Sequence, residues 1–152
     1  MNAHELIIRR RFEMHIRKFM EADRQAVIAL WTECELTRPW NDPAKDIDRK
    51  MLFQPDLFFV GILDSRLMAS AMAGYDGHRG SVFYLAVHPD CQGRGYGQRL
   101  MAFIEDTLIG LGCPKLNIAV RTSNDPVLGF YDNLAYKKDD VFCIGKRLIP
   151  DV

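Results

Sequence analysis

The sequence has no excess of either charge, no long apolar run and no pair of closely spaced cysteines. Twenty Lys and Arg balance twenty Asp and Glu. A general nucleic-acid binder shows a basic excess, so nucleic acid is not expected as a partner. No apolar run approaches the roughly 18 residues of a membrane span, so no membrane association is expected. No secretory signal is recognisable either, which favours a cytoplasmic location.

Metal-ligand spacings are absent as well. The cysteines form no C-x-x-C pair, which excludes a zinc ribbon and a thioredoxin motif; they are Cys34, Cys91, Cys113 and Cys143. No two histidines have metal-ligand spacing with a third partner, so no metal site is predicted. In the cytoplasm the four thiols are expected to be reduced.

What is present is the composition of one soluble globular domain. Of 152 residues, 48% are hydrophobic and 26% charged, which is an ordinary balance. A regular pattern of strands and helices starts at Met14, so we expect residues 1–13 to be an N-terminal extension and residues 14–152 a single domain. The extension holds Arg9–Arg11, which is the one feature that could attract nucleic acid.

Hydrophobic periodicity predicts alternating strands and helices. Strands are expected at His15–Phe19, Leu57–Leu63, Leu67–Tyr75, Ser81–Val87, Lys115–Arg121 and Tyr136–Leu148. Helices are expected at Glu21–Cys34, Ala44–Gln54 and Asn124–Leu134, and from Gly97 to about Gly110. Hairpins mixed with crossover helices indicate an α+β domain with a mixed sheet.

The most informative segment is Gln92–Gly97, which lies between a predicted strand and a predicted helix. Its three glycines allow a sharp turn and a close approach to a ligand. The free N–H groups at the following helix start favour an anion. The dinucleotide fingerprint is not met, because Gln98 stands where a glycine is needed, and no P-loop lysine follows. A turn that merely joins strand to helix is the alternative interpretation.

With these residues in place, the sequence resembles the GCN5-related N-acetyltransferase (GNAT) superfamily. Gln92–Gly97 matches its Q/R-x-x-G-x-G/A acetyl-CoA signature, Tyr84–Asp90 its preceding strand, and Asn124–Tyr136 its N-x-x-x-x-x-x-Y segment. Within the superfamily it is most similar to the uncharacterised YpeA-type acetyltransferases, on Pro39–Pro43, Gly74–Gly80 and Gly112–Lys115. The resemblance spans roughly Met14 to Leu148.

The resemblance implies a mostly antiparallel mixed sheet, splayed around a CoA cleft and flanked by about four helices. It implies acetyl-CoA as cosubstrate, bound by Leu85, Ala86, Val87, Gln92, Gly93, Arg94, Gly95, Tyr96, Gly97 and Asn124. It further implies that Tyr131 is the general acid that protonates the departing thiolate. Family members are often dimers, so a monomer and a homodimer are both open.

The general base is not identified, because neither acidic residue that the family commonly uses is present. Ala119 occupies one of these positions, and the strand Ser81–Val87 contains no acid. The remaining candidates for the base or the acceptor site are Asp76, His78 and Tyr84, with Glu35 and Asp42 behind them. Asp76 and His78 also fit plain turn chemistry, and a water chain without a single base is a further alternative.

The segment Trp40-Asn41-Asp42 lies between the first two predicted helices. The resemblance implies that this region lines the acceptor site. An exposed Trp40 would form an apolar lid and Asp42 would attract an amine. Alternatively, Asp42 before Pro43 is a helix start, with the carboxylate capping free N–H groups.

The function predicted from these features is transfer of an acetyl group from acetyl-CoA to a primary amine of a small molecule or peptide, by direct attack in a ternary complex. A non-catalytic acyl-CoA binding or sensing module is the alternative, motivated by the missing base. A protein-interaction domain that keeps only the scaffold is a third interpretation.

Overall fold

The structure is a computed structural model that describes residues 2–5 and 13–151. At its centre is a five-stranded sheet in the order β1-β2-β3-β4-β5. The strands are β1 (His15–Lys18), β2 (Phe58–Leu63), β3 (Arg66–Tyr75), β4 (Gly80–Val87) and β5 (Leu116–Asn117). The first four run antiparallel in sequence order, and β5 runs parallel to β4. This confirms the predicted mixed, mostly antiparallel sheet.

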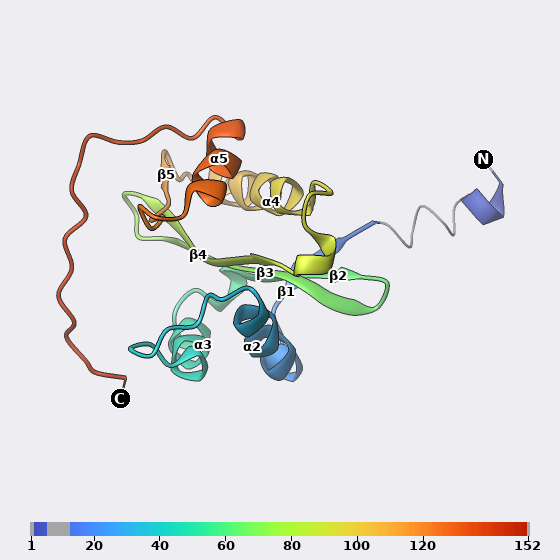
Figure 1. Cartoon of the computed structure of the whole chain (residues 1–152), viewed down its shortest axis with the longest axis horizontal. Helices are drawn as coiled ribbons and strands as arrows, with labels where there is room; N and C mark the ends of the chain where they lie inside the picture. The colour runs from blue at the N-terminus through green and yellow to red at the C-terminus, as the bar shows by residue number, and fades with distance from the viewer. Residues whose placement is uncertain (1, 6–12, 152) are drawn as a thin grey trace.

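Helices cover both faces of the sheet (Figure 1). One face carries α2 (Arg24–Glu33) and α3 (Pro43–Leu52), and the other carries α4 (Tyr96–Gly110) and α5 (Asp125–Asn133). Short 3-10 turns precede α2, β2 and the glycine loop, at Glu21–Asp23, Pro55–Leu57 and Pro89–Cys91. The α+β class expected from the sequence is therefore correct.

Strand alternation divides the core into two clusters, one on each face of the sheet. Phe58 and Val60 of β2 pack with Trp31 on the α2–α3 side, whereas their neighbour Phe59 packs with Leu100 on the α4–α5 side. All five side chains are nearly inaccessible to solvent. Because both faces are buried, β2 reads in sequence as a continuous apolar run rather than as an alternating one.

Two predicted strands differ from the structure. The strand expected at Lys115–Arg121 is a ladder of only Leu116 and Asn117, which pair with Gly80 and Ser81. Residues 118–121 have no ladder partner in the described chain, although half-buried Ile118 and Val120 still pack on the core. The alternating apolar pattern of residues 115–121 thus reflects packing on the core. The β4–β5 ladder nevertheless ends at Ser81 and Asn117.

The closing strand expected at Tyr136–Leu148 is wrong for this structure. Residues 137–150 form no regular element, and Phe142 and Ile144 are exposed. High β-propensity does not make a strand without a partner edge. The segment instead passes outside the domain and returns to α3, where Asp151 is buried (Figure 1).

The predicted N-terminal extension lies mostly outside the described residues, and Arg9–Arg11 lie entirely outside them. Met14, the expected start of the domain, is buried immediately before β1. No helix in the described ranges is long and apolar enough to cross a membrane.

Candidate active site

A bulge in β4 creates the central feature of the site. Ser70 pairs with Ala86 and Met72 with Phe83, so one β3 residue between them faces two residues of β4, Tyr84 and Leu85. Tyr84 has a φ of 51°, in the left-handed region. An inserted residue of this kind bends its strand and re-aims its side chains.

The bulge and the short β5 together leave a split in the sheet. β4 pairs with β5 only at Gly80 and Ser81. From Val82 to Val87 no described strand pairs with the outer edge of β4. Leu85, Ala86 and Val87, which the family resemblance implies bind the cosubstrate, therefore line an open edge.

The glycine loop lies at the end of this edge. Gly93 and Gly95 have φ values of 75° and 84°, and Gly95 is the N-cap of α4 without any side-chain cap. The N–H groups of a first helical turn lack intrahelical partners. The Gln92 side chain donates a 2.9 Å hydrogen bond from Nε2 to the Val87 carbonyl oxygen, which ties the loop to the strand. Arg94 is exposed in the loop.

Helix α5 closes this part of the site. A Cβ placed on Gly97 would lie 3.1 Å from the Phe130 ring and 3.7 Å from Val87 Cγ2. A side chain at position 97 would therefore crowd the Phe130 ring, because strand, loop and α5 converge there. Asn124 is the N-cap of α5, and its side chain makes no capping bond. The three segments that matched the family motifs thus meet at one place.

Tyr131 lies next to Phe130 and is 7% exposed. Its ring packs edge-on against Phe130 and Tyr136. Burial raises the pKa of Tyr131 to about 12, because desolvation disfavours the phenolate. The hydroxyl therefore keeps its proton at neutral pH and has a hydrogen bond to donate.

On the opposite side of the sheet, Tyr84 reaches into α3. Its hydroxyl donates a 2.6 Å hydrogen bond to Asp46 Oδ2. The Tyr84 ring stacks on Trp31, with centroids 3.8 Å apart. Trp31 Nε1 donates to Ser70 Oγ, which in turn donates to the Tyr84 carbonyl oxygen. Burial, followed by the bond to Asp46, raises the pKa of Tyr84.

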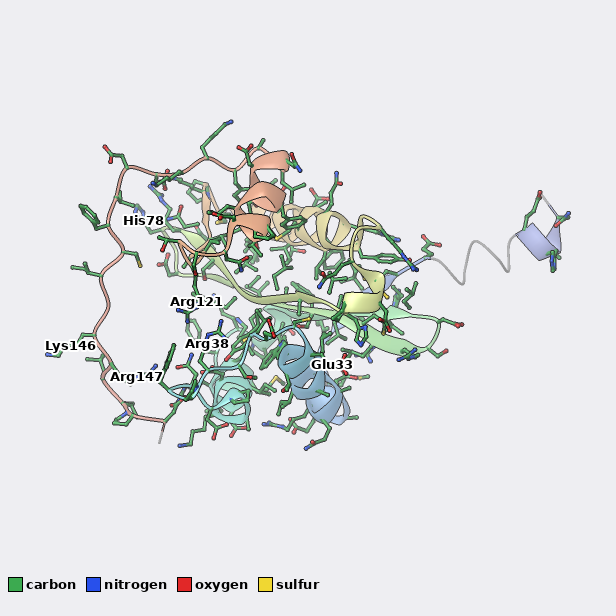
Figure 2. The ribbon with its side chains drawn as sticks, in the orientation of Figure 1. Glu33, Arg38, His78, Arg121, Lys146 and Arg147 are labelled. Atoms are coloured by element: carbon green, nitrogen blue, oxygen red, sulfur yellow. The ribbon has the colours of Figure 1, made fainter. Side chains whose placement is uncertain are left out.

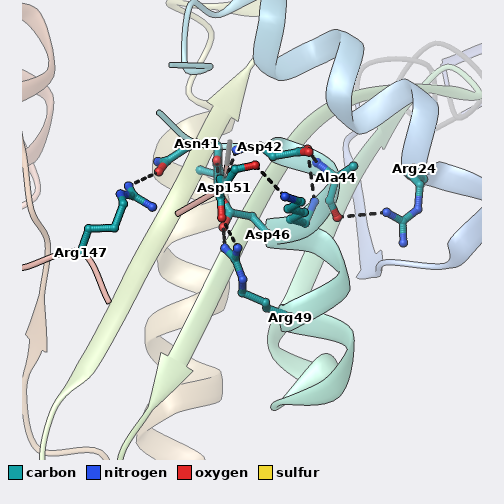
Figure 3. A network of polar contacts seen from close by, with 10 residues as sticks. Arg24, Asn41, Asp42, Ala44, Asp46, Arg49, Arg147 and Asp151 are labelled. Carbon is teal, nitrogen blue, oxygen red and sulfur yellow. Dashed lines mark hydrogen bonds and ion pairs between the residues drawn. The ribbon is translucent and has the colours of Figure 1, made fainter. Parts of the chain in front are cut away.

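Asp46 belongs to a polar network at the N-terminal end of α3 (Figure 3). Its Oδ1 lies 2.7 Å from Arg49 Nη1. Arg49 also pairs with Asp151, whose Oδ2 accepts a 2.8 Å hydrogen bond from the Asp42 backbone N–H. Lys45 Nζ donates to the Asp151 carbonyl oxygen. These bonds lower the pKa of Asp151, chiefly through the Asp42 N–H and the Arg49 guanidinium.

Asp42 is a helix cap in this structure. Its carboxylate accepts hydrogen bonds from the N–H groups of Ala44 and Lys45, and Pro43 occupies the first turn. This confirms the capping alternative. Trp40 is 49% exposed, with the Arg121 guanidinium 5.6 Å from its ring centroid. Asn41 Oδ1 accepts a 2.6 Å hydrogen bond from Arg147.

The structure does not bring Asp76 and His78 to Tyr84. They lie in the β3–β4 turn, and roughly 13 Å of strand separates Gly80 from Tyr84 at ~3.3 Å per residue. The Asp76 carboxylate accepts bonds of 2.8 and 2.7 Å from the N–H groups of His78 and Arg79. These bonds lower the pKa of Asp76, which makes it a weak base. The turn-chemistry alternative describes Asp76 correctly.

Comparison with known proteins identifies the family to which this chain belongs. The family model described as Acetyltransferase (GNAT) family matches residues 24–136. The chain belongs to the GNAT acetyltransferase family. It is 51% identical over 138 residues to a protein named as an acetyltransferase in Yersinia enterocolitica, covering 91% of this chain and 98% of that protein. A Pectobacterium atrosepticum protein with the same kind of name has the same identity and coverage.

Solved GNAT structures share the fold at low sequence identity. The complex of AAC(6')-Iy with the bisubstrate analogue CoA-S-monomethyl-acetylneamine has a TM-score of 0.70 and 19% identity, covering 89% of this chain and 99% of that one. The Escherichia coli ribosomal-protein-S18-alanine N-acetyltransferase has a TM-score of 0.70 and 21% identity, covering 84% and 79%. These structures support the fold, and the family model and the relatives at 51% identity make the protein an acetyltransferase of GNAT type.

Sequence reasoning missed Asp46 and Arg49. A spacing signal was available, because Asp46 lies in the first turn of the predicted helix, four residues after Asp42 at its start. What the sequence did not show was that Tyr84 points to that turn. Within the described ranges, no three His, Cys, Asp or Glu side chains gather in a way that could hold a metal ion.

Proposed function

We propose that this GNAT protein transfers the acetyl group of acetyl-CoA to a primary amine of a small molecule or peptide, by direct attack in a ternary complex. The observation that carries the proposal is the split between β4 and β5. It has an uncapped helix start and Tyr131 on one side, and the Tyr84–Asp46 pair on the other. The four cysteines are free thiols, which supports action in the reducing cytoplasm.

The open edge and the glycine loop fit acetyl-CoA. The amide-bearing pantetheine arm would bind the backbone of Leu85–Val87 as an added strand binds a sheet edge. The diphosphate would lie on the N–H groups of Gln92–Gly97, at the positive end of α4. Asn124, whose side chain makes no capping bond, would contact the arm from α5.

The reaction forms a C–N bond between the amine and the thioester carbonyl carbon and breaks the C–S bond. The amine loses one proton and the sulfur leaves as a thiolate. A Tyr131 phenol with a pKa of about 12 is a weaker acid than an ordinary thiol, whose pKa is near ~8.5. Tyr131 therefore stabilises the thiolate by a hydrogen bond. The oxyanion would accept a bond from a backbone N–H of the open edge near Leu85.

The Tyr84–Asp46 pair would receive the proton of the amine. A protonated Tyr84 oxygen accepts a hydrogen bond from an amine N–H while its own proton points to Asp46. Transfer along this pair moves the amine proton to Tyr84 and the Tyr84 proton to the Asp46 carboxylate. A positioned base of this kind contributes typically ~10²–10⁴-fold to the rate.

The proposal is tested first by ligand binding and then by turnover. Acetyl-CoA and CoA, at 100 times their Kd, should stabilise the protein by roughly 2.7 kcal/mol and raise Tm by about 5–10 °C. NAD and ATP should produce a smaller shift. Release of free CoA thiol should then require an amine. Binding without amine-dependent thiol release over a broad panel would support the non-catalytic acyl-CoA module instead.

A further inference from the structure

Three arginines from separate segments meet at one turn of the α2–α3 loop. The turn is Arg38–Asn41, closed by a 3.1 Å hydrogen bond from the Asn41 N–H to the Arg38 carbonyl oxygen. Arg121, which follows β5, lies over Trp40 of this turn. Arg147, from the C-terminal segment, donates to Asn41. Figure 2 labels the three arginines, together with Lys146 of the C-terminal segment.

No carboxylate of the described chain lies within ion-pair distance of Arg38, Arg121 or Arg147. Arg17, Arg24, Arg49 and Arg99 each pair with an Asp or Glu. Among the other described arginines, Arg66, Arg79 and Arg94 also have no such partner, but they lie at separate turns and loops, whereas the three arginines named first meet at one turn. Arg38 is fixed through one nitrogen, which donates to the carbonyl oxygens of Glu35 and Thr37. We call Arg38, Arg121 and Arg147 the arginine cluster.

The arginine cluster lies on the amine side of the split. Arg121 ends the extended run 118–121 that diverges from β4, and the turn it contacts leads directly into α3. Helix α3 carries Asp46, the partner of Tyr84. The nearby carboxylates of Asp42, Asp46 and Asp151 are already bonded to helix N–H groups, Tyr84 and Arg49.

We propose that the acceptor is an amine that also carries a carboxylate or phosphate group, which the arginine cluster binds while the amino group faces Tyr84. This rests on the proposed function and adds the substrate class. Guanidinium groups suit these anions because their planar N–H forks bond two oxygens at once. Arg147 also helps to lower the pKa of Asp151, but that carboxylate pairs with Arg49. Three arginines at one turn, with no ion pair to a carboxylate of the described residues, leave a site that an anion completes.

The test compares amines that differ only in the anionic group. Wild-type protein is assayed for CoA thiol release with O-phosphoethanolamine against ethanolamine, and with β-alanine against β-alaninamide. We expect kcat/KM to be at least about tenfold higher for the anionic member of one pair, the size of one charged hydrogen bond. Equal or lower values for both anionic members would overturn the proposal.

Single variants then assign the effect to the cluster. Arg121→Ala and Arg147→Ala should remove that preference by raising KM for the anionic amine, with the neutral amine unchanged. Arg66→Ala, an exposed arginine in the β2–β3 hairpin, is the matched control and should keep the preference. If the cluster variants raise KM for acetyl-CoA as much as for the anionic amine, the cluster serves the phosphates of CoA and the proposal is wrong.

A binding experiment separates this inference from the proposed function. With CoA present at saturation, O-phosphoethanolamine should raise Tm of wild-type and Arg66→Ala protein more than ethanolamine does, and the difference should vanish in Arg121→Ala. That result supports an anion site even if no amine is acetylated. No difference in wild-type protein, together with no preference in turnover, refutes the site.

Discussion

The Tyr84 hydroxyl and the Asp46 carboxylate are joined by a 2.6 Å hydrogen bond that crosses from the bulged strand β4 to helix α3. The bond connects the bulge at the open edge of the sheet to the N-terminal half of α3. Trp31 stacks on the same tyrosine ring and holds it in place. The position of the Tyr84 side chain is therefore fixed by contacts of both its ring and its hydroxyl.

Tyr84→Phe should lower kcat/KM for the amine by at least about tenfold, up to the ~10²–10⁴ of a positioned base. Asp46→Asn should lower it similarly, because the amide is not a base. Affinity for acetyl-CoA, measured by calorimetry, should stay within about twofold in both. A Phe variant with unchanged turnover would exclude Tyr84 from proton transfer.

Tyr131→Phe should reduce turnover while acetyl-CoA binding and Tm change little. None of the described residues forms a hydrogen bond with the Tyr131 hydroxyl, so its removal breaks no contact of the free protein. The ring, which carries the packing against Phe130 and Tyr136, remains. Single-turnover measurement of thiol release isolates the step. Loss of acetyl-CoA affinity in place of turnover would assign Tyr131 to binding.

Gly97→Ala should destabilise the protein by about 1–3 kcal/mol, the usual cost of overpacking, and weaken acetyl-CoA binding. The new methyl group would crowd the Phe130 ring at 3.1 Å, while its distance of 3.7 Å to Val87 is an ordinary contact. Gly110→Ala is the control in the same helix, with no atom within 4 Å of the added Cβ. It should be neutral or stabilise by up to about 1 kcal/mol. Urea unfolding of both variants provides the comparison.

Asp76→Ala should leave kcat/KM unchanged, because its carboxylate is bonded within the β3–β4 turn. The variant should be somewhat less stable than wild type above the usual carboxyl pKa. Since the folded state lowers the pKa of Asp76, the stability it contributes is present above the unfolded pKa and lost as pH falls. A large loss of turnover with unchanged Tm would instead indicate that Asp76 acts as the general base.

Alkaline pH should weaken the fold through Tyr131. Its pKa rises from 10 to about 12 on folding, so the neutral form is favoured in the native state. Its contribution to stability is complete below pH ~10 and is lost as pH rises toward 12. Chemical unfolding at pH 9, 10 and 11 should show a decline that is smaller in Tyr131→Phe.

Local chemistry explains which features the sequence predicted well. The Asp42 cap before Pro43, the glycine loop before α4 and the apolar pattern of the strands all depend on neighbouring residues. The Tyr84–Asp46 bond joins residues 38 positions apart, and it depends on a bulge that no local pattern marks. The segment 137–150 has strand-like composition, yet whether it forms a strand depends on a partner edge elsewhere in the fold.

The split between β4 and β5 leaves the sheet with an incomplete ladder. Backbone amides along Val82–Val87 that point away from β3 have no strand to bond, so they exchange with deuterium from solvent more readily than their inward-facing neighbours. A ligand that bonds this edge would slow them one by one. Hydrogen exchange along β4 would therefore report ligand binding directly. The first and last amides whose exchange slows would show how far along the edge a bound molecule extends.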